Sequence, residues 1–391
     1  MANIVDYLAW RGDLTWSRSP FNDVDNLLLC TLTYTDFEKV IPGLASSETI
    51  ALSEAAKRYF EIYTQEEIRT RSGFTSQVPL MIFQQMADSA RFRRVRLGGF
   101  FNMIDDKSEV QISAVTYHLG DGSLFVSYRG TDNSLAGWKE DFNMSFTDAT
   151  PGQQMAVSYL NHVMRQFDGP VRIGGHSKGG NFAIYAAAFC EEQFKDRIVR
   201  IWNNDGPGFS KEVASSPELA SVWEKITNFV PEGSIFGLLL NNPVPRKVIL
   251  SGRSGIYQHD TLSWQVLGTG LVEAPGLSEA SQYFERIVKD WIDRLSPLER
   301  REFVDTIFNL AGSGENKKIS DIDTSLKGYG EILKAIAALP KEKQHVLKTT
   351  LTALVKSGAE NLSQPLTGKV GTWIGKAEKA AERLGILEIK E

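Results

Sequence analysis

The sequence predicts an α/β fold in which a mostly parallel sheet is covered on both faces by helices and is followed by a C-terminal helical appendage. Three observations lead to this prediction. Strand and helix patterns alternate between residues 152 and 251, as they do in sheets whose strands are joined by crossover helices. The segment Val171–Phe189 changes without a break from an apolar strand through a tight turn to a helix. From about Pro275 onward, only helical patterns remain.

Length and composition set the outline of the molecule. The 391 residues exceed one typical domain, and we expect three regions. These are an N-terminal helical cover with the start of the core at residues 1–95, the α/β core at 96–275 and a C-terminal helical region at 280–391. Hydrophobic residues make up 42% of the chain and charged residues 23%, as in an ordinary globular protein. The net charge of -5 gives no basic field for a nucleic acid, so no nucleic-acid partner is expected.

The N-terminal residues and the two cysteines favour a cytoplasmic location. The N-terminal residues include acids where a signal peptide needs basic and then apolar residues. No stretch approaches the ~18 apolar residues of a membrane span, so no transmembrane segment is expected. Cys30 lies in an apolar run and Cys190 ends the Ala-rich stretch. Both are predicted to be buried thiols rather than metal ligands or a disulfide.

The N-terminal part of the chain is predicted to pack as helices against the core. Helical patterns cover residues 23–32, 53–63 and 79–89. From Phe100 the period changes to two. This alternation predicts a hairpin at the start of the core, with strands at 110–117 and 124–128 and a turn at 120–122.

The core is predicted to continue as alternating elements. Its helices are expected at 152–167, 178–194 and 217–225, and its strands at 171–175, 198–203, 225–230 and 247–251. The appendage begins with a helix whose apolar stripe is formed by Phe284, Ile287, Val288, Trp291 and Leu295. The next helix starts at Ser296-Pro297-Leu298-Glu299, which combines an N-cap serine, a proline at the first helical position and a capping-box acid.

The chemistry of the chain is expected at Ser177. The run Gly175-His176-Ser177-Lys178-Gly179 is a G-x-S-x-G motif between a predicted strand and a predicted helix. In a nucleophile elbow of the α/β-hydrolase fold, the serine lies in this strained turn, and the glycines remove Cβ atoms that would clash with neighbouring backbone. The alternative is a glycine-rich turn with an incidental serine. The flanking strand and helix favour the nucleophile.

A serine nucleophile needs a base and an acid, which α/β-hydrolases supply in the chain order Ser, Asp or Glu, His. His259 follows the last predicted core strand, where the base belongs. The other histidines lie in helical patterns, before a turn or in the elbow: His118, His162, His176 and His345. Asp205 and Glu232 each follow a strand beyond the nucleophile. Asp205 is preferred because its glycine-rich turn would hold a short carboxylate firmly, but Glu232 remains the alternative acid.

The oxyanion of the reaction intermediate needs preorganised N–H donors. One donor is expected to be the backbone N–H of Lys178 at the start of the helix. The second should come from the end of an earlier strand, where Tyr128-Arg129-Gly130-Thr131 offers the N–H of Thr131 and its hydroxyl.

These motifs resemble those of the class 3 (fungal-type) lipases over about residues 95 to 265. The resemblance rests on Arg129-Gly130-Thr131 with Trp138, Asp141 and Phe146 downstream, and on Gly175-His176-Ser177-Lys178-Gly179. Further segments are similar to a bacterial branch of that superfamily: Tyr7–Asp13, Asp205-Gly206-Pro207-Gly208-Phe209, Ser234-Ile235-Phe236-Gly237 and Gln258-His259-Asp260. The resemblance implies Ser177 as nucleophile, His259 as base, Thr131 and Lys178 as oxyanion donors, and a mobile lid within Asn133–Asn143. Lys178 departs from the family pattern, which has an apolar residue there.

The sequence thus predicts a serine ester hydrolase, either a carboxylesterase or a lipase-like enzyme, that forms an acyl-enzyme without a metal or an organic cofactor. Its substrate is expected to be a small-molecule ester, with lipids included. A thioesterase or an acyltransferase would use the same elbow. The alternative from another class is a catalytically weak or inactive hydrolase-fold scaffold that binds a partner through its helical appendage. The sequence leaves the oligomeric state open.

Overall fold

The structure is a computed structural model of the chain. It describes residues 1–71, 79–105, 107–131, 139–141, 143–144, 147, 149–311 and 340–341. Trp138, Phe146, part of the expected lid at Asn133–Asn143 and most of the expected helical region after residue 311 lie outside the described residues.

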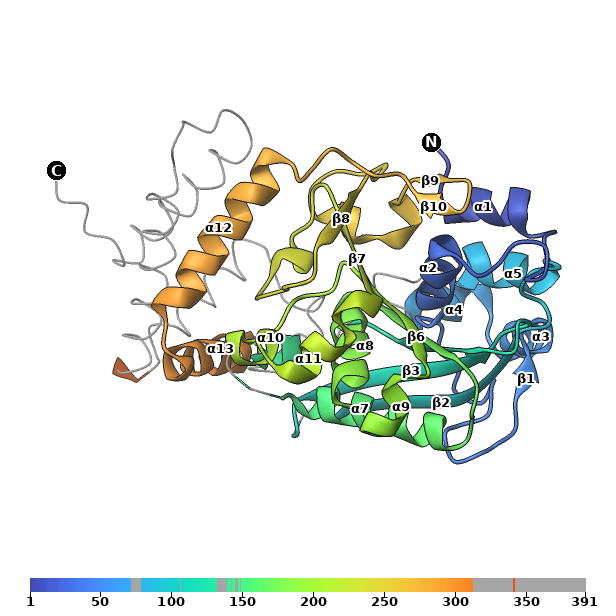
Figure 1. Ribbon diagram of the computed structural model, residues 1–391, viewed down its shortest axis with the longest axis horizontal. Coiled ribbons are helices and arrows are strands. Elements are labelled where there is room, and N and C mark those ends of the chain that lie inside the picture. The colour runs from blue at the N-terminus through green and yellow to red at the C-terminus, as the bar shows by residue number, and fades with distance from the viewer. Residues whose placement is uncertain are drawn as a thin grey trace.

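The described part of the chain is built around an eight-stranded sheet whose strands lie in the order of the sequence (Figure 1). The strands are β1 (Ile50–Ala51), β2 (Arg96–Asp105), β3 (Val110–His118), β4 (Leu124–Tyr128), β5 (Val171–His176), β6 (Ile198–Asn204), β7 (Ile226–Pro231) and β8 (Arg246–Ile249). Strands β1 to β4 pair antiparallel, and β4 to β8 pair parallel. A separate pair is formed by β9 (Val266–Leu267) and β10 (Gly270–Leu271). The mostly parallel sheet predicted from the sequence is confirmed.

The order of the strands decides where the crossover helices lie. Parallel strands are joined by right-handed crossovers, and here every step from β4 to β8 moves in the same direction across the sheet. All crossover helices must therefore lie on one face. They include α7 (Pro151–Arg165), α8 (Lys178–Phe189), α9 (Glu192–Lys195), α10 (Lys211–Ala214), α11 (Pro217–Val222) and the turn η3 (Trp223–Lys225). The apolar residues of α7, α8 and α11 form one hydrophobic cluster with the strands.

The N-terminal helices cover the opposite face, which the crossovers leave open. They are α1 (Ile4–Arg11), α2 (Asp23–Leu32), α3 (Leu52–Ile62), α4 (Gln65–Arg71), η2 (Pro79–Phe83) and α5 (Gln84–Asp88). Their apolar residues form a second cluster. Strand β4 separates the two clusters, because Leu124 and Val126 belong to the crossover side and Phe125 to the N-terminal side, as the alternation of side chains along a strand requires. The predicted N-terminal packing is thus needed to bury the sheet.

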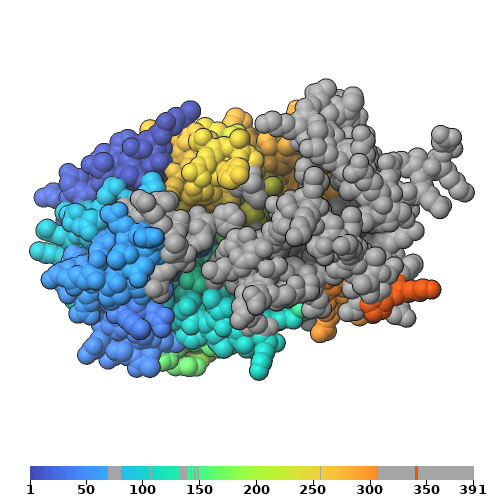
Figure 2. All heavy atoms as spheres, turned by 180° about the vertical axis from the view of Figure 1, so that it is seen from behind, coloured from blue at the N-terminus to red at the C-terminus, as the bar shows by residue number. Residues whose placement is uncertain are grey.

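The remaining elements follow β7. Three short turns lie near the carboxyl ends of the last strands: η4 (Phe236–Leu238), η5 (Gly255–His259) and η6 (Thr261–Ser263). The chain then returns to the N-terminal helices, since Val266 N donates to Ala2 O at 2.9 Å. In the view from behind, the dark blue N-terminal residues border the yellow residues of this segment (Figure 2). Two longer helices complete the described residues up to 311: α12 (Glu279–Arg294) and α13 (Pro297–Ala311).

The structure has elements that were not predicted, among them α1 and β1, and two further differences have a local cause. Strand β2 was not predicted, because Gly98 and Gly99 interrupt its alternation, and the register shifts between Gly98 and Phe101. Gly99 there has a φ of 62°, which fits a β-bulge. The helix predicted at 178–194 is two helices, because Cys190 leaves the helical conformation with a ψ of 168°. Both cysteines are buried free thiols, as predicted.

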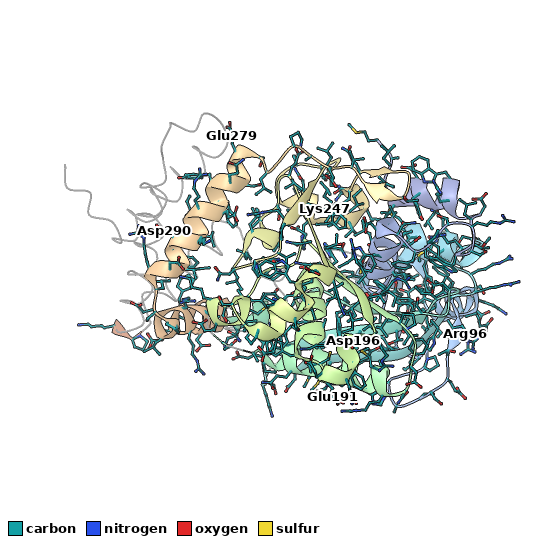
Figure 3. The ribbon with its side chains drawn as sticks, in the orientation of Figure 1. Arg96, Glu191, Asp196, Lys247, Glu279 and Asp290 are labelled. Atoms are coloured by element: carbon teal, nitrogen blue, oxygen red, sulfur yellow. The ribbon has the colours of Figure 1, made fainter. Side chains whose placement is uncertain are left out.

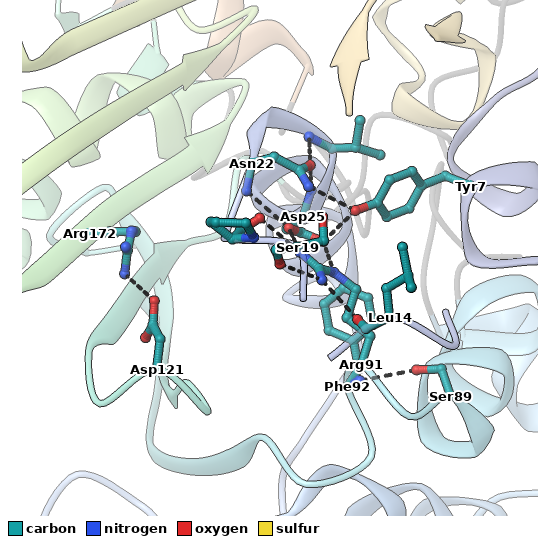
Figure 4. Close-up of polar contacts among 12 residues, drawn as sticks. Tyr7, Leu14, Ser19, Asn22, Asp25, Ser89, Arg91, Phe92, Asp121 and Arg172 are labelled. Atoms are coloured by element: carbon teal, nitrogen blue, oxygen red, sulfur yellow. Dashed lines mark hydrogen bonds and ion pairs between the residues drawn. The ribbon is translucent and has the colours of Figure 1, made fainter. Parts of the chain in front are cut away.

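A fully buried ion pair anchors the N-terminal cover (Figure 4). The guanidinium of Arg91 contacts both oxygens of Asp25, at 2.7 and 2.5 Å. Asp25 also accepts from the hydroxyl of Tyr7 at 3.0 Å. The remaining N–H groups of Arg91 donate to the carbonyls of Leu14, Ser19 and Pro20. One side chain therefore holds the loop between α1 and α2 against α2 itself.

We expect Arg91→Met to lower the free energy of unfolding by about 3–5 kcal/mol, because it leaves the Asp25 carboxylate buried without its counter-charge. Chemical unfolding followed by fluorescence measures this loss. The control is Arg58→Met, which removes an Arg–Glu pair of similar chemistry from the surface of α3. That change should cost about 1 kcal/mol or less. Equal losses in the two variants would show that Arg91 does not anchor the cover.

Candidate functional site

Ser177 lies in a strained turn between β5 and α8. Its φ is 58° and its ψ is -136°, a conformation that a residue with a side chain adopts only when its surroundings impose it. Ser177 N donates to Asn204 O at 3.0 Å, and Gly180 N donates to Ser177 O at 2.8 Å. These bonds tie the turn to the end of β6 and to the first turn of α8.

The glycines around Ser177 allow backbones to cross at very short range. A Cβ atom on Gly175 would clash with the backbone of Gly179, and one on Gly179 would clash with the backbone of Tyr128 at the end of β4. A Cβ atom on Gly130 would lie 2.7 Å from Ser177 Cβ. The loop after β4 therefore lies directly against the turn that holds Ser177.

His259 and Asp205 meet at the same edge of the sheet. Asp205 follows β6 directly, and its Oδ2 lies 2.6 Å from Nδ1 of His259 in η5. The carboxylate is buried, and its Oδ1 accepts from Ser234 Oγ at 2.5 Å and from Gly237 N at 3.1 Å. A carboxylate can only accept, so in the neutral ring the proton is on Nδ1 and the lone pair is on Nε2. This is the tautomer that a general base needs.

The side chain of Glu232 takes no part in this arrangement. Among the described residues, the hydrogen bonds of Glu232 are made by its backbone, with Ile249 O and Ser278 N. Asp260, next to the histidine in sequence, accepts from Leu262 N and pairs with Arg253. The structure thus brings Asp205, and neither of these two acids, to His259.

Phe236 connects His259 to the cavity that Ser177 lines. The ring of Phe236 lies 4.2 Å from that of His259, between centroids, and lines the same cavity as Ser177. The side chain of His259 is 21% exposed. Within the described residues, Ser177 Oγ and His259 Nε2 make no hydrogen bond to each other, which is common before a substrate is bound.

His176 supports the loop of His259, a role that the sequence did not indicate. Its Nε2 lies 2.8 Å from the carbonyl oxygen of His259, and its Nδ1 lies 2.9 Å from the hydroxyl of Tyr34. Burial is the main reason why the pKa of His176 is well below its ordinary value. The neutral ring therefore donates through Nε2 to the carbonyl and accepts from Tyr34 through Nδ1.

Thr131 lies in the loop after β4 and Lys178 at the start of α8, the two segments that meet at Ser177. Thr131 follows β4 by three residues, and its hydroxyl donates to Asp141 Oδ2 at 2.5 Å. Lys178 is the first residue of α8, a position where backbone N–H groups point out of the helix. Asp141 Oδ1 is buried and finds no hydrogen-bond partner within the described residues. Burial raises the pKa of Asp141 to about 6, although Lys178 and the Thr131 hydroxyl act in the opposite direction.

A cavity of about 330 Å³ opens beside Ser177. One wall belongs to the core and includes Asp141, Ser177, Lys178, Pro207, Ile235, Phe236, Leu239 and Leu240. The facing wall comes from the last two helices and consists of Phe284, Val288, Trp291, Ile292, Leu295, Arg300, Phe303 and Val304. Figure 3 marks α12 by Glu279 at its start and Asp290 further along. Four of the five residues in the predicted apolar stripe therefore line the cavity beside Ser177: Phe284, Val288, Trp291 and Leu295.

The described residues give no sign of a metal centre or a membrane span. No group of three or more His, Cys, Asp or Glu side chains within them is placed to hold a metal ion. None of the helices they form is long and apolar enough to cross a bilayer.

Comparison with known proteins identifies one family. The family model described as Mbeg1-like matches residues 86–309, which is more than half of the 391 residues. The match runs from α5 to α13 and so includes the last two helices as well as the parallel strands. Comparison with the curated proteins gives no match.

Proposed function

Because the chain belongs to the Mbeg1-like family, whose description specifies no reaction, we propose a function from the geometry of the site. The protein is a serine ester hydrolase that forms an acyl-enzyme on Ser177. The observation that carries this proposal is the meeting of three features at one edge of the sheet. These are the strained turn at Ser177, the cavity beside it, and the contact of 2.6 Å between His259 and Asp205.

The reaction would begin with the transfer of the Ser177 proton to His259 Nε2 as Oγ attacks the ester carbonyl. Asp205 holds the ring in the required tautomer and stabilises the imidazolium that forms. His259 then returns the proton to the leaving alcohol. Water repeats the sequence on the acyl-enzyme and releases the acid, so Ser177 and His259 return to their starting states.

Thr131 and Lys178 would stabilise the negative charge on the substrate oxygen. Their backbone N–H groups flank Ser177 from the loop after β4 and from the start of α8. Such preorganised donors usually supply the largest single part of the rate enhancement. The hydrogen bond from the Thr131 hydroxyl to Asp141 supports the donor loop.

The cavity favours an ester with an apolar acyl chain. Its walls are almost entirely apolar apart from Asp141, Ser177, Lys178 and Arg300. A methylene group takes roughly the volume of a water molecule in the liquid, about 30 Å³. The cavity of about 330 Å³ therefore has room for a chain of medium length. Hydrolysis of thioesters and acyl transfer to another alcohol would use the same catalytic groups. The location that we propose is the cytoplasm, which the buried free thiols support.

We expect a fluorophosphonate probe to label the protein at Ser177 and nowhere else, because only an activated serine reacts with it. Ser177→Ala should lose the labelling and about 10⁴-fold or more in the hydrolysis of p-nitrophenyl esters, with a thermal midpoint close to that of the wild type. Mass spectrometry locates the adduct. Ser254→Ala, at an exposed serine before η5 whose side chain makes no capping bond, is the control. An unlabelled wild type would favour the scaffold alternative instead.

The acid is tested by Asp205→Asn and Glu232→Gln, assayed on the same ester. Asp205→Asn should lower kcat by about 10³ to 10⁴, because the amide no longer selects the Nδ1–H tautomer of His259. The backbone tolerates this change, since asparagine accepts the positive φ of 56° found at this position. Glu232→Gln should keep kcat within a few-fold. A large loss in Glu232→Gln alone would assign the acid to Glu232.

Trp291 is expected to limit the acyl chain. Its ring packs edge-on against Phe303 at 5.6 Å and lines the cavity. Trp291→Ala should shift the best substrate in a series of p-nitrophenyl esters toward longer chains, because the cavity becomes larger. Trp223→Ala, at a surface tryptophan outside the cavity, should leave the chain-length profile unchanged. An unaltered profile in Trp291→Ala would place the acyl chain elsewhere.

A further inference from the structure

Lys178 follows Ser177 directly and carries its charge into a fully buried position. Its Nζ lies 3.0 Å from Oε2 of Glu140, and neither side chain is exposed to solvent. The same Nζ lies 5.5 Å from the centre of the Phe182 ring. Taking two charges out of water offsets most of the attraction between them, so a buried pair adds little net stability. Its place beside the nucleophile calls for a different explanation.

Glu140 connects the segment 139–141 to three elements of the fold. Its Oε2 accepts from Gln111 N in β3 at 3.0 Å, and its Oε1 accepts from Gly152 N in the first turn of α7 at 2.7 Å. A Cβ atom at residue 152 would clash with this carboxylate, so the glycine there permits the approach. Lys178 adds the third connection, to α8. Together these bonds fix Glu140 on all sides.

Asp141, the residue after Glu140, supports Thr131, which is one of the two proposed oxyanion donors. Asp141 accepts a hydrogen bond from the hydroxyl of Thr131, and it lines the cavity together with Ser177 and Lys178. Because Glu140 and Asp141 are adjacent in the chain, any force that fixes the backbone of one fixes the other.

We propose that Lys178 and Glu140 are positioning residues: their ion pair clamps the segment 139–141 onto the helix of the nucleophile and thereby holds Asp141 and Thr131 in place for the oxyanion. This inference rests on the proposed function, because it assigns the pair to the same reaction. It also explains a lysine at a position where the resembling lipases have an apolar residue.

The pair also sets the charge balance at Asp141. Lys178 on α8 and His259 on η5 lower the pKa of Asp141, whereas Glu140 on its own segment raises it. Tyr34 interacts with Asp141 from the N-terminal cover, and Arg300 on α13 lines the same cavity. The ionised carboxylate is the stronger acceptor for the Thr131 hydroxyl. Part of the activity should therefore be lost as the pH drops through the pKa of Asp141, about 6, in addition to any loss that follows from protonation of the base.

Lys178→Met is the main test. It removes a positive charge that lowers the pKa of Asp141, so that pKa rises further and the acidic limb of the pH–rate profile moves to higher pH. Loss of alignment should lower kcat by about 10²-fold, with KM for the ester within about twofold of the wild type. Lys178→Arg keeps the charge and should restore most of kcat and the position of the limb. Lys195→Met, which breaks an ion pair on α9 away from the site, should change none of these.

The double variant Lys178→Met with Glu140→Gln separates positioning from stability. Lys178→Met alone leaves Glu140 buried without its counter-charge and should lower the thermal midpoint. The double variant removes both buried charges, so its midpoint should lie closer to that of the wild type, while kcat stays low. Recovery of kcat together with the midpoint would show that the pair only stabilises the fold, and the proposal would be wrong. An unchanged kcat and limb in Lys178→Met would overturn it as well.

Hydrogen exchange gives a readout that needs no activity. Amide exchange at residues 139–144 should speed up in Lys178→Met and return toward the wild-type rate in Lys178→Arg. If exchange there is the same in Lys178→Met as in the wild type, the pair does not clamp the segment, whether or not the protein hydrolyses esters. A wild type that neither reacts with a fluorophosphonate nor hydrolyses esters refutes the proposed function, whereas faster exchange in the variant would still show the clamp.

Discussion

The crossing of backbones at Ser177 is the constraint on which the rest of the site depends. Strand β5, helix α8 and the loop after β4 approach one another so closely that Gly130, Gly175 and Gly179 have no room for a Cβ atom. This contact forces Ser177 into its unusual conformation and places the loop of Thr131 beside it. The strain is local, and the hydrogen bonds to β6 and within α8 hold it. A larger residue at any of the three glycines would separate Ser177 from the groups around it.

The strands lie side by side in the order of the sequence, and this order explains why N-terminal helices must cover one face of the sheet. Since the crossover helices all lie on one face, the other face needs α1 to α5 to exclude water. The cover also reaches the site. Asn26 on α2 exchanges side-chain hydrogen bonds with Asn204, which bonds to the backbone of Gly175. Tyr34 holds His176, and His176 holds the carbonyl of His259. The N-terminal residues thus act on the geometry of His259 as well as on stability.

Two ion pairs among the described residues are fully buried, and they have different consequences. Arg91 and Asp25 are surrounded by backbone carbonyls and a tyrosine and lie in the N-terminal cover, away from Ser177. Lys178 and Glu140 lie beside Ser177 and next to a carboxylate that lines the cavity. The facing wall of that cavity comes from α12 and α13. A boundary near residue 275 between core and helical region stays a prediction. With or without such a boundary, α12 and α13 line the cavity beside Ser177.

The sequence by itself indicated most elements of the core and their order, because apolar periodicity and the glycines of the elbow are local signals. It also indicated Ser177, Thr131, Lys178, His259 and the preference for Asp205, since each follows a strand end and strand ends of a parallel sheet meet at one edge. Strand β2 was missed because its glycines break the alternation. Only the tertiary structure brought Asp205 rather than Glu232 to the imidazole, gave His176 and Glu140 their partners, and laid the apolar stripe of α12 over Ser177. These contacts join residues far apart in the chain, and no local pattern records which side chains meet when separate elements pack.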